Sequence, residues 1–148
     1  MYIYLLFVHL VAAVMGLGAA FGFPIVLKSA KTVSQAKFAL ALLHKLEMLP
    51  KIGSLLLLAT GLWLGFLEPY LFEEVWFIGS IVLFLAAMVI VAGILPRKAK
   101  KQSELLASAQ GEQLPSEYKA IAAQSARLES VTHAIAFILI LLMVFKPF

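Results

Sequence analysis

Residues 71–95 read LFEEVWFIGSIVLFLAAMVIVAGIL, and this stretch contains no charged side chain after Glu74. A helix needs about 20 predominantly apolar residues to cross the hydrocarbon core of a bilayer. The run from Val75 to Leu95 meets that length. An open strand edge is not tolerated in hydrocarbon, so the stretch predicts a transmembrane α-helix.

The composition of the whole chain is that of a membrane protein. Of its 148 residues, 63% are hydrophobic and 14% are charged, and the mean hydropathy is +1.00. Soluble domains average about 45–50% apolar and about 25% charged residues, so an ordinary soluble enzyme is excluded. The same apolar content excludes a disordered chain. No cysteine is present, which excludes disulfides, iron–sulfur clusters and thiolate chemistry.

Three further stretches are apolar enough to be spans, namely Ile3–Leu27, about Phe38–Leu67 and about Ser130–Phe145. The last stretch is short, and the helical spacing of the residues before it predicts a helix that begins near Ser116. Pro50 lies inside the second helix and predicts a kink there. We therefore expect an all-α fold, an integral membrane four-helix bundle that forms a single four-span transmembrane domain over residues 1–148.

The distribution of charge predicts the orientation of the bundle. Ten basic residues lie between spans one and two or between spans three and four, whereas Lys146 lies on the other side with three glutamates. Cytoplasmic loops carry the excess of lysine and arginine, so we expect both termini outside a bacterial cytoplasmic membrane, which the chain crosses several times. The ten are Lys28, Lys31, Lys37, Lys45, Arg97, Lys98, Lys100, Lys101, Lys119 and Arg127.

Small residues recur four apart within the predicted spans, which lets helix backbones approach closely in lipid. Packing inside one bundle is the simpler interpretation of this spacing, and a homodimer is the alternative. The lipid bilayer is one expected partner. We expect no nucleic acid partner, because the pI near 9.4 follows from the membrane topology. The glycines that would form the dimer are Gly16, Gly18 and Gly22, or Gly61 and Gly65.

Six ionisable side chains lie within or at the edges of the spans, where such groups are expensive and commonly functional. His44, Glu47 and Lys51 are three and four residues apart and share one face of the second helix. Glu129 and His133 are four apart in the last helix. We expect Glu47, Lys51 and Glu129 either to orient histidine ligands or to form an internal ion-pair network.

Two of the three histidines are predicted to lie at nearly the same depth. His44 is seven residues past Lys37, and His133 is six residues past Arg127, on helices that enter from the same side. Imidazoles from facing helices can ligate a haem iron from both sides. The spacing therefore predicts His44 and His133 as ligands of a haem iron. The alternative is that both are interfacial histidines bonded to backbone or headgroups.

The third histidine, His9, is predicted to lie in the opposite leaflet, five residues inside Tyr4. Met143 in the last helix is predicted at a similar depth, three residues inside Lys146. Histidine and methionine together are a known haem ligand set, which makes His9 and Met143 further candidates for binding a cofactor. Packing is the alternative role for Met143, because methionine commonly fills gaps. For His9 the alternative is a hydrogen bond to a neighbouring helix in place of a metal.

Signatures of other chemistry are missing from the sequence. It contains no HExxH, GxGxxG or P-loop motif and no pairing of a nucleophile with a base. The catalytic residues of any enzymatic activity therefore stay unknown at this level.

Short apolar motifs give the chain a family resemblance. Residues 5–14 read LLFVHLVAAV and are followed by Gly16 and Gly18, while residues 60–63 read TGLW and Trp76 begins the third span. This pattern resembles a bacterial family of four-helix predicted integral membrane proteins of unknown function. The first span is also distantly similar to CopD-type copper-resistance proteins and HemJ-type protoporphyrinogen oxidases.

The resemblance implies a four-helix bundle in which the histidine of the first span, His9, is a candidate haem ligand. HemJ-type enzymes also use a lysine deeper in the bundle, and Lys51 is the nearest internal lysine here.

Residues and resemblance together predict a small haem-b-binding membrane protein, similar to a cytochrome b, that transfers electrons to or from a membrane redox partner or handles haem. One alternative is a cofactor-free scaffold, accessory subunit or small-solute passage. Another is a HemJ-like protoporphyrinogen oxidase.

Overall fold

The computed structural model describes residues 1–147, which form helices joined by short connections. Two segments, η1 and η3, are π-helical turns that continue a longer helix, and η2 is a 3₁₀ turn. In chain order the elements are α1 Tyr2–Ala13, η1 Val14–Gly18, α2 Ala19–Ser29, α3 Val33–Leu46, α4 Met48–Leu67, η2 Pro69–Glu73, α5 Val75–Met88, η3 Val89–Ile94, α6 Leu95–Ala107 and α7 Ser116–Phe145.

These elements form four rods that are long and apolar enough to cross a membrane, which confirms the four predicted spans. The part of the chain that the structure describes contains no strand, so the all-α expectation is also confirmed. The fourth rod begins at Ser116, as the spacing of its apolar residues predicts. The rods are Tyr2–Ser29, Val33–Leu67, Val75–Ala107 and Ser116–Phe145.

The second rod begins earlier than the predicted Phe38 and is divided in two. Its first helix, α3, starts at Val33 because the hydroxyl of Thr32 accepts a hydrogen bond from the backbone N–H of Gln35 at 3.3 Å. α3 ends at Leu46, and the turn at Glu47 precedes α4. Pro50 has no N–H to donate to the carbonyl of Leu46, which explains a break one turn before the proline.

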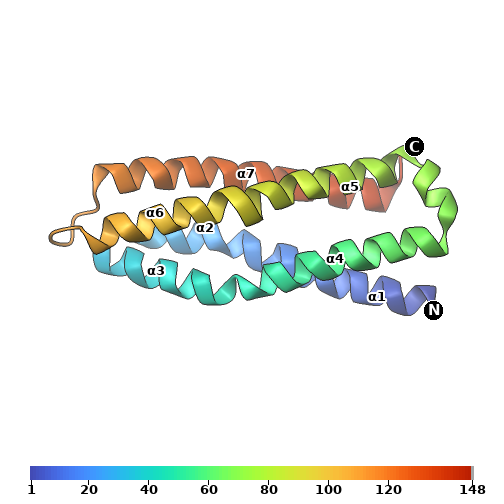
Figure 1. Ribbon diagram of the computed structural model, residues 1–148, viewed down its shortest axis with the longest axis horizontal. Helices are drawn as coiled ribbons and strands as arrows, with labels where there is room; N and C mark the ends of the chain where they lie inside the picture. The colour runs from blue at the N-terminus through green and yellow to red at the C-terminus, as the bar shows by residue number, and fades with distance from the viewer. Residues whose placement is uncertain (148) are drawn as a thin grey trace.

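The rods run along one long axis, and both termini lie at the same end (Figure 1). α1 packs along α4 in a first hairpin, residues 2–67, and α5 packs along α7 in a second hairpin, residues 75–145. The hairpins meet mainly where α3 contacts α6 and α2 contacts α7. We call the end with residues 108–115 the loop end and the end with both termini the terminal end.

A compact apolar core joins the hairpins at the loop end. Val33 and Ala36 of α3 pack with Leu106 of α6 and Tyr118 of α7, and all four are buried. α6 is amphipathic here, since Gln102 and Leu106 are buried while Arg97, Lys100 and Lys101 are exposed. The third rod continues past Leu95 because its polar segment contributes one apolar face to this core.

The loop before α7 caps the start of α3. Both carboxylate oxygens of Glu112 accept hydrogen bonds from Ser34, from its backbone N–H at 3.1 Å and from its hydroxyl at 2.6 Å. The carbonyl of Glu112 also accepts from the N–H of Val33 at 3.0 Å. A carboxylate at a helix N-terminus satisfies free N–H groups and complements the helix dipole. This contact ties the second hairpin to the first.

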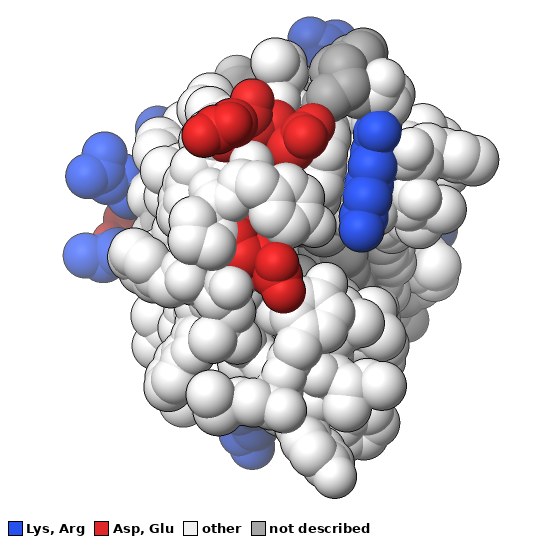
Figure 2. All heavy atoms as spheres, turned by 90° about the vertical axis from the view of Figure 1, so that its right-hand side faces the viewer, with Lys and Arg blue, Asp and Glu red and all other residues white. Residues whose placement is uncertain are grey.

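The terminal end has a smaller aromatic core and carries three of the eight acidic residues, Glu68, Glu73 and Glu74. Leu71, Trp76 and Phe77 are buried together there, and Lys146 lies 5.5 Å above the Trp76 ring. Figure 2 looks onto this end and shows acidic side chains gathered on it. The ten basic residues of the predicted cytoplasmic loops belong to the loop half. This separation supports the predicted orientation, although the side that each end faces stays a prediction.

The first and second rods cross at a pair of glycines, Gly16 and Gly53, which we call the glycine crossing. A Cβ atom on Gly53 of α4 would lie 2.5 Å from the backbone N of Gly16 and 2.9 Å from the carbonyl O of Ala12. Only hydrogen at Gly53 allows this approach, because the obstructing atoms are backbone. Gly61 faces His9, and Gly65 lies under Phe72 and Phe77, so these glycines also pack inside the chain.

The Glu112 cap predicts a pH dependence of stability. Hydrogen bonds from Ser34 hold the pKa of the Glu112 carboxyl below its ordinary value of 4.5. A lowered pKa in the folded state stabilises the fold above the unfolded pKa, and this contribution disappears as the pH falls through the folded pKa. We expect Glu112→Gln to lower the thermal midpoint at pH 7 and to match wild type near pH 2. A difference in thermal midpoint that persists at pH 2 would contradict the cap. Glu104→Gln is the matched change at an exposed glutamate, and an equal fall of its midpoint at pH 7 would also contradict the cap.

The glycine crossing predicts a large effect of a single methyl group. Gly53→Ala places a methyl against backbone that side-chain rotation cannot clear, so we expect a loss of about 1–3 kcal/mol or more in unfolding free energy. Gly79→Ala in α5 is the control, because a Cβ there meets nothing within 4 Å. That variant is expected to be neutral, or stabilised by up to about 1 kcal/mol through helix propensity. Equal midpoints for the two variants in detergent unfolding would contradict the crossing.

Candidate functional site

His9 is the one histidine that the bundle buries. It lies on α1 against α4, its residue is 8% exposed, and its Nδ1 is 2.7 Å from the hydroxyl oxygen of Thr60. The glycine crossing sets this pairing. His9 is seven residues before Gly16 and Thr60 is seven residues after Gly53, about two turns along antiparallel helices.

The hydrogen bonds of Thr60 determine which nitrogen of His9 carries the proton. The Thr60 hydroxyl donates to the carbonyl of Leu56 at 2.6 Å, with the carbonyl of Leu57 at 3.3 Å. A hydroxyl has one proton to donate, so towards His9 the Thr60 oxygen accepts. This arrangement favours Nδ1 of His9 as the donor, with the hydrogen on that nitrogen. Nε2 is left with its lone pair, the form in which a neutral imidazole binds a metal.

Gly61 gives the His9 ring its space on α4. A Cβ atom at Gly61 would lie 3.3 Å from Cε1 of His9, which is the ring atom between Nδ1 and Nε2. That distance is tighter than ordinary van der Waals contact. A larger residue would press on the ring edge next to the free nitrogen, so glycine and threonine side by side hold the imidazole in one position.

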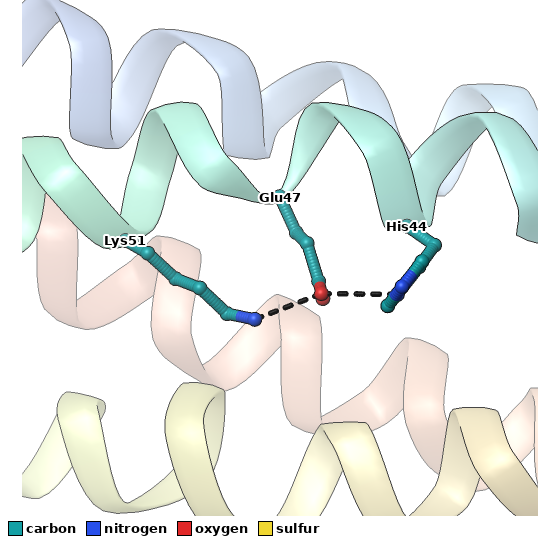
Figure 3. Close-up of polar contacts among 3 residues, drawn as sticks. All are labelled: His44, Glu47 and Lys51. Atoms are coloured by element: carbon teal, nitrogen blue, oxygen red, sulfur yellow. Dashed lines mark hydrogen bonds and ion pairs between the residues drawn. The ribbon is translucent and has the colours of Figure 1, made fainter.

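His44, Glu47 and Lys51 form a second polar group, on the surface at the α3–α4 junction (Figure 3). Oε1 of Glu47 is 3.0 Å from Nδ1 of His44 and accepts from Nζ of Lys51 at 2.8 Å. The His44 side chain is 82% exposed, and those of Lys51 and Glu47 are 54% and 29% exposed. The shared helix face predicted from the sequence is therefore present, as an ion-pair cluster open to its surroundings.

His133 has a different environment. It lies on α7, partly buried, and stacks on the ring of Phe21 with centroids 4.5 Å apart and planes at 20°. Its predicted companion Glu129, also on α7, lies within electrostatic range of Lys28 of α2. The stacking of His133 on Phe21 joins the two hairpins.

The predicted ligand pairs do not share neighbours. Counted from the glycine crossing, Phe21 lies opposite Met48, so His44 is about one helical turn nearer the loop end than His133. The two histidines are therefore offset in depth by about one turn, and joint ligation of one iron by His44 and His133 stays a prediction. Met143 is 41% exposed on α7, and α1 and α7 are not among the helix pairs that pack closely.

The described residues contain no cluster of three or more histidine, cysteine, aspartate or glutamate side chains that could hold a metal ion by themselves. The best-oriented single donor is Nε2 of His9, because its ring is buried and its tautomer is fixed.

Two residues of these sites were not predicted from the sequence. Thr60 carried a usable signal, because the glycine spacing of the first two spans gives the helix register that places it opposite His9. Phe21 carried none, since the contact of α2 with α7 depends on how the two hairpins join at the loop end.

Comparison with known proteins identifies the family. No curated protein and no solved structure matches the chain. A family model described as "Predicted integral membrane protein (DUF2269)" matches residues 3–147, nearly the whole chain and all four rods. The chain belongs to this family of predicted integral membrane proteins.

Proposed function

We propose that this protein binds haem b in the membrane, with Nε2 of His9 as an axial ligand, and that it transfers electrons or handles haem. The observation that carries the proposal is the 2.7 Å hydrogen bond between Nδ1 of His9 and the hydroxyl of Thr60. Histidines that ligate metals almost always donate their other ring N–H to a second group, which fixes the tautomer and orientation. When bound, haem supplies one-electron chemistry.

The donor set of the described residues fits such a group. Neutral imidazole is an ordinary axial ligand of haem iron, and four-helix bundles build cofactor sites from side chains of facing helices. The two hairpins meet at α3–α6 and α2–α7, and also at the terminal end, where Phe77 of α5 packs on Gly65, one turn from Gly61. Met143 of α7 would be the second residue to hold the group, as the sequence predicts.

The proposal predicts a spectrum that depends on His9. Protein purified from haem-sufficient cells should show the Soret band and the reduced α-band of haem b. His9→Ala should abolish or shift these bands, and added imidazole should restore them, because it replaces the missing ligand. A colourless wild-type preparation would sink the proposal. Loss of the bands in His44→Ala and His133→Ala, with His9→Ala unchanged, would move the iron to the other pair.

The Thr60 hydrogen bond gives a sharper test of the same site. Thr60→Val keeps the shape of the side chain and removes the acceptor, so haem affinity should fall about 10–100-fold. Thr132→Val is the matched control. Thr132 is buried in α7, and its hydroxyl donates to the carbonyl of Glu129 in the same helix at 2.8 Å. Equal haem affinity in wild type and Thr60→Val would argue against a tuned ligand.

The alternative functions make different predictions for the same preparation. A scaffold, accessory subunit or solute passage without cofactor would give colourless protein, with Glu47 as the centre of a surface ion-pair cluster. A protoporphyrinogen oxidase would restore growth of a bacterial strain that lacks this enzyme, and failure to do so counts against it. Lys51, the internal lysine nearest to the position of the HemJ lysine, is paired with Glu47 and does not match the HemJ motif.

A further inference from the structure

The cluster of His44, Glu47 and Lys51 lies at a membrane boundary. α4, from Met48 to Leu67, has 20 residues, and at about 1.5 Å per residue it matches the roughly 30 Å hydrocarbon thickness of a bilayer. Glu47 is the turn residue directly before this helix. The cluster is therefore at headgroup level. His44 lies one turn before, and Lys51 one turn after, the point where the second rod enters hydrocarbon.

The cluster retains unused hydrogen-bonding capacity towards its surroundings. Both contacts within the cluster go to Oε1 of Glu47. Oε2 has no hydrogen-bond partner among residues 1–147. Lys51 donates one of its three N–H groups to Glu47, so two remain. In Figure 3 all three side chains extend away from their own helix, on the side where the ribbons of the second hairpin are drawn.

An apolar path continues from the cluster into the bilayer. Met48, Ile52 and Leu55 of α4 follow it at helical spacing, and all three are exposed. A molecule with a charged head at the cluster and hydrocarbon chains along these residues would match the helix over its depth. That arrangement is the shape of a membrane phospholipid.

The order of charges selects the headgroup. We propose that this surface binds a phospholipid with a primary amine in its headgroup, of the ethanolamine class, whose ammonium donates to Glu47 and whose phosphate accepts from Lys51. The pair is itself a carboxylate beside an ammonium, so its complement is a zwitterion with the opposite order. A glycerol headgroup also offers a phosphate to Lys51, but it has no cation to offer to Glu47. A choline headgroup has a cation without N–H donors, so it makes no hydrogen bond to Oε2.

The test is native mass spectrometry of the full chain, delipidated in detergent and titrated with phospholipids that share the same acyl chains and carry ethanolamine, choline or glycerol headgroups. Wild type should retain the ethanolamine lipid about tenfold more tightly than either of the others, the size expected for a charged hydrogen bond. Glu47→Gln should reduce the preference over choline to about twofold or less, and Lys51→Gln should weaken retention of all three lipids.

Two matched changes separate this site from general surface charge. Glu104→Gln alters an exposed glutamate on α6, and Lys45→Gln alters an exposed lysine next to His44. Neither should change the order of lipid affinities. Equal retention of the three lipids by wild type would overturn the proposal, as would wild-type selectivity in Glu47→Gln. Loss of selectivity in Glu104→Gln would overturn it too. So would a spectrum in which the chain is a dimer that retains none of the three lipids. The proposal does not depend on haem, so it stands or fails separately.

Discussion

The contact of Gly16 with Gly53 is the constraint on which the first hairpin depends. Backbone touches backbone there, so the rotation and register of α1 against α4 are fixed by atoms that cannot move aside. Two turns towards the terminal end, the same register brings His9 onto Thr60 and Gly61. Lipid tails provide no hydrophobic force between helices, so close approach at small residues is what holds such a pair together. The histidine site is thus a consequence of how the helices pack.

The two ends of the bundle are stabilised by different physics. At the loop end, Leu106, Tyr118 and their neighbours bury apolar surface as a soluble domain does, and Glu112 supplies a cap across the hairpins. At the terminal end, a small aromatic cluster and Lys146 over Trp76 close the turn between the hairpins. Between these ends the hairpins rely on fewer mutual contacts, such as Phe21 with His133. The exposed polar cluster and the apolar path along α4 belong to this less tightly joined region.

The sequence predicts the spans well because hydrocarbon demands long apolar helices, and such runs are visible without any partner. It misplaces the start of α3, because residues 33–37 are too polar to look like a span and are helical for reasons of capping and loop-end packing. It groups His44, Glu47 and Lys51 on one face correctly, since helical spacing alone decides that. Counting residues from a charged boundary estimates depth only, so it does not reveal that His44 faces outward while His133 stacks on Phe21. The rotation of each helix depends on packing between segments far apart in the chain.

The central claim is that His9 is held in one tautomer, with the proton on Nδ1 and the lone pair on Nε2. The most direct measurement is nitrogen-15 NMR of the His44→Gln/His133→Gln variant, in which His9 is the only histidine of the three in the chain. In protein free of cofactor at pH 8, the account predicts a one-bond coupling to hydrogen at Nδ1 and an unprotonated signal from Nε2. A proton on Nε2, or averaging of the two nitrogens by rapid exchange, would contradict it.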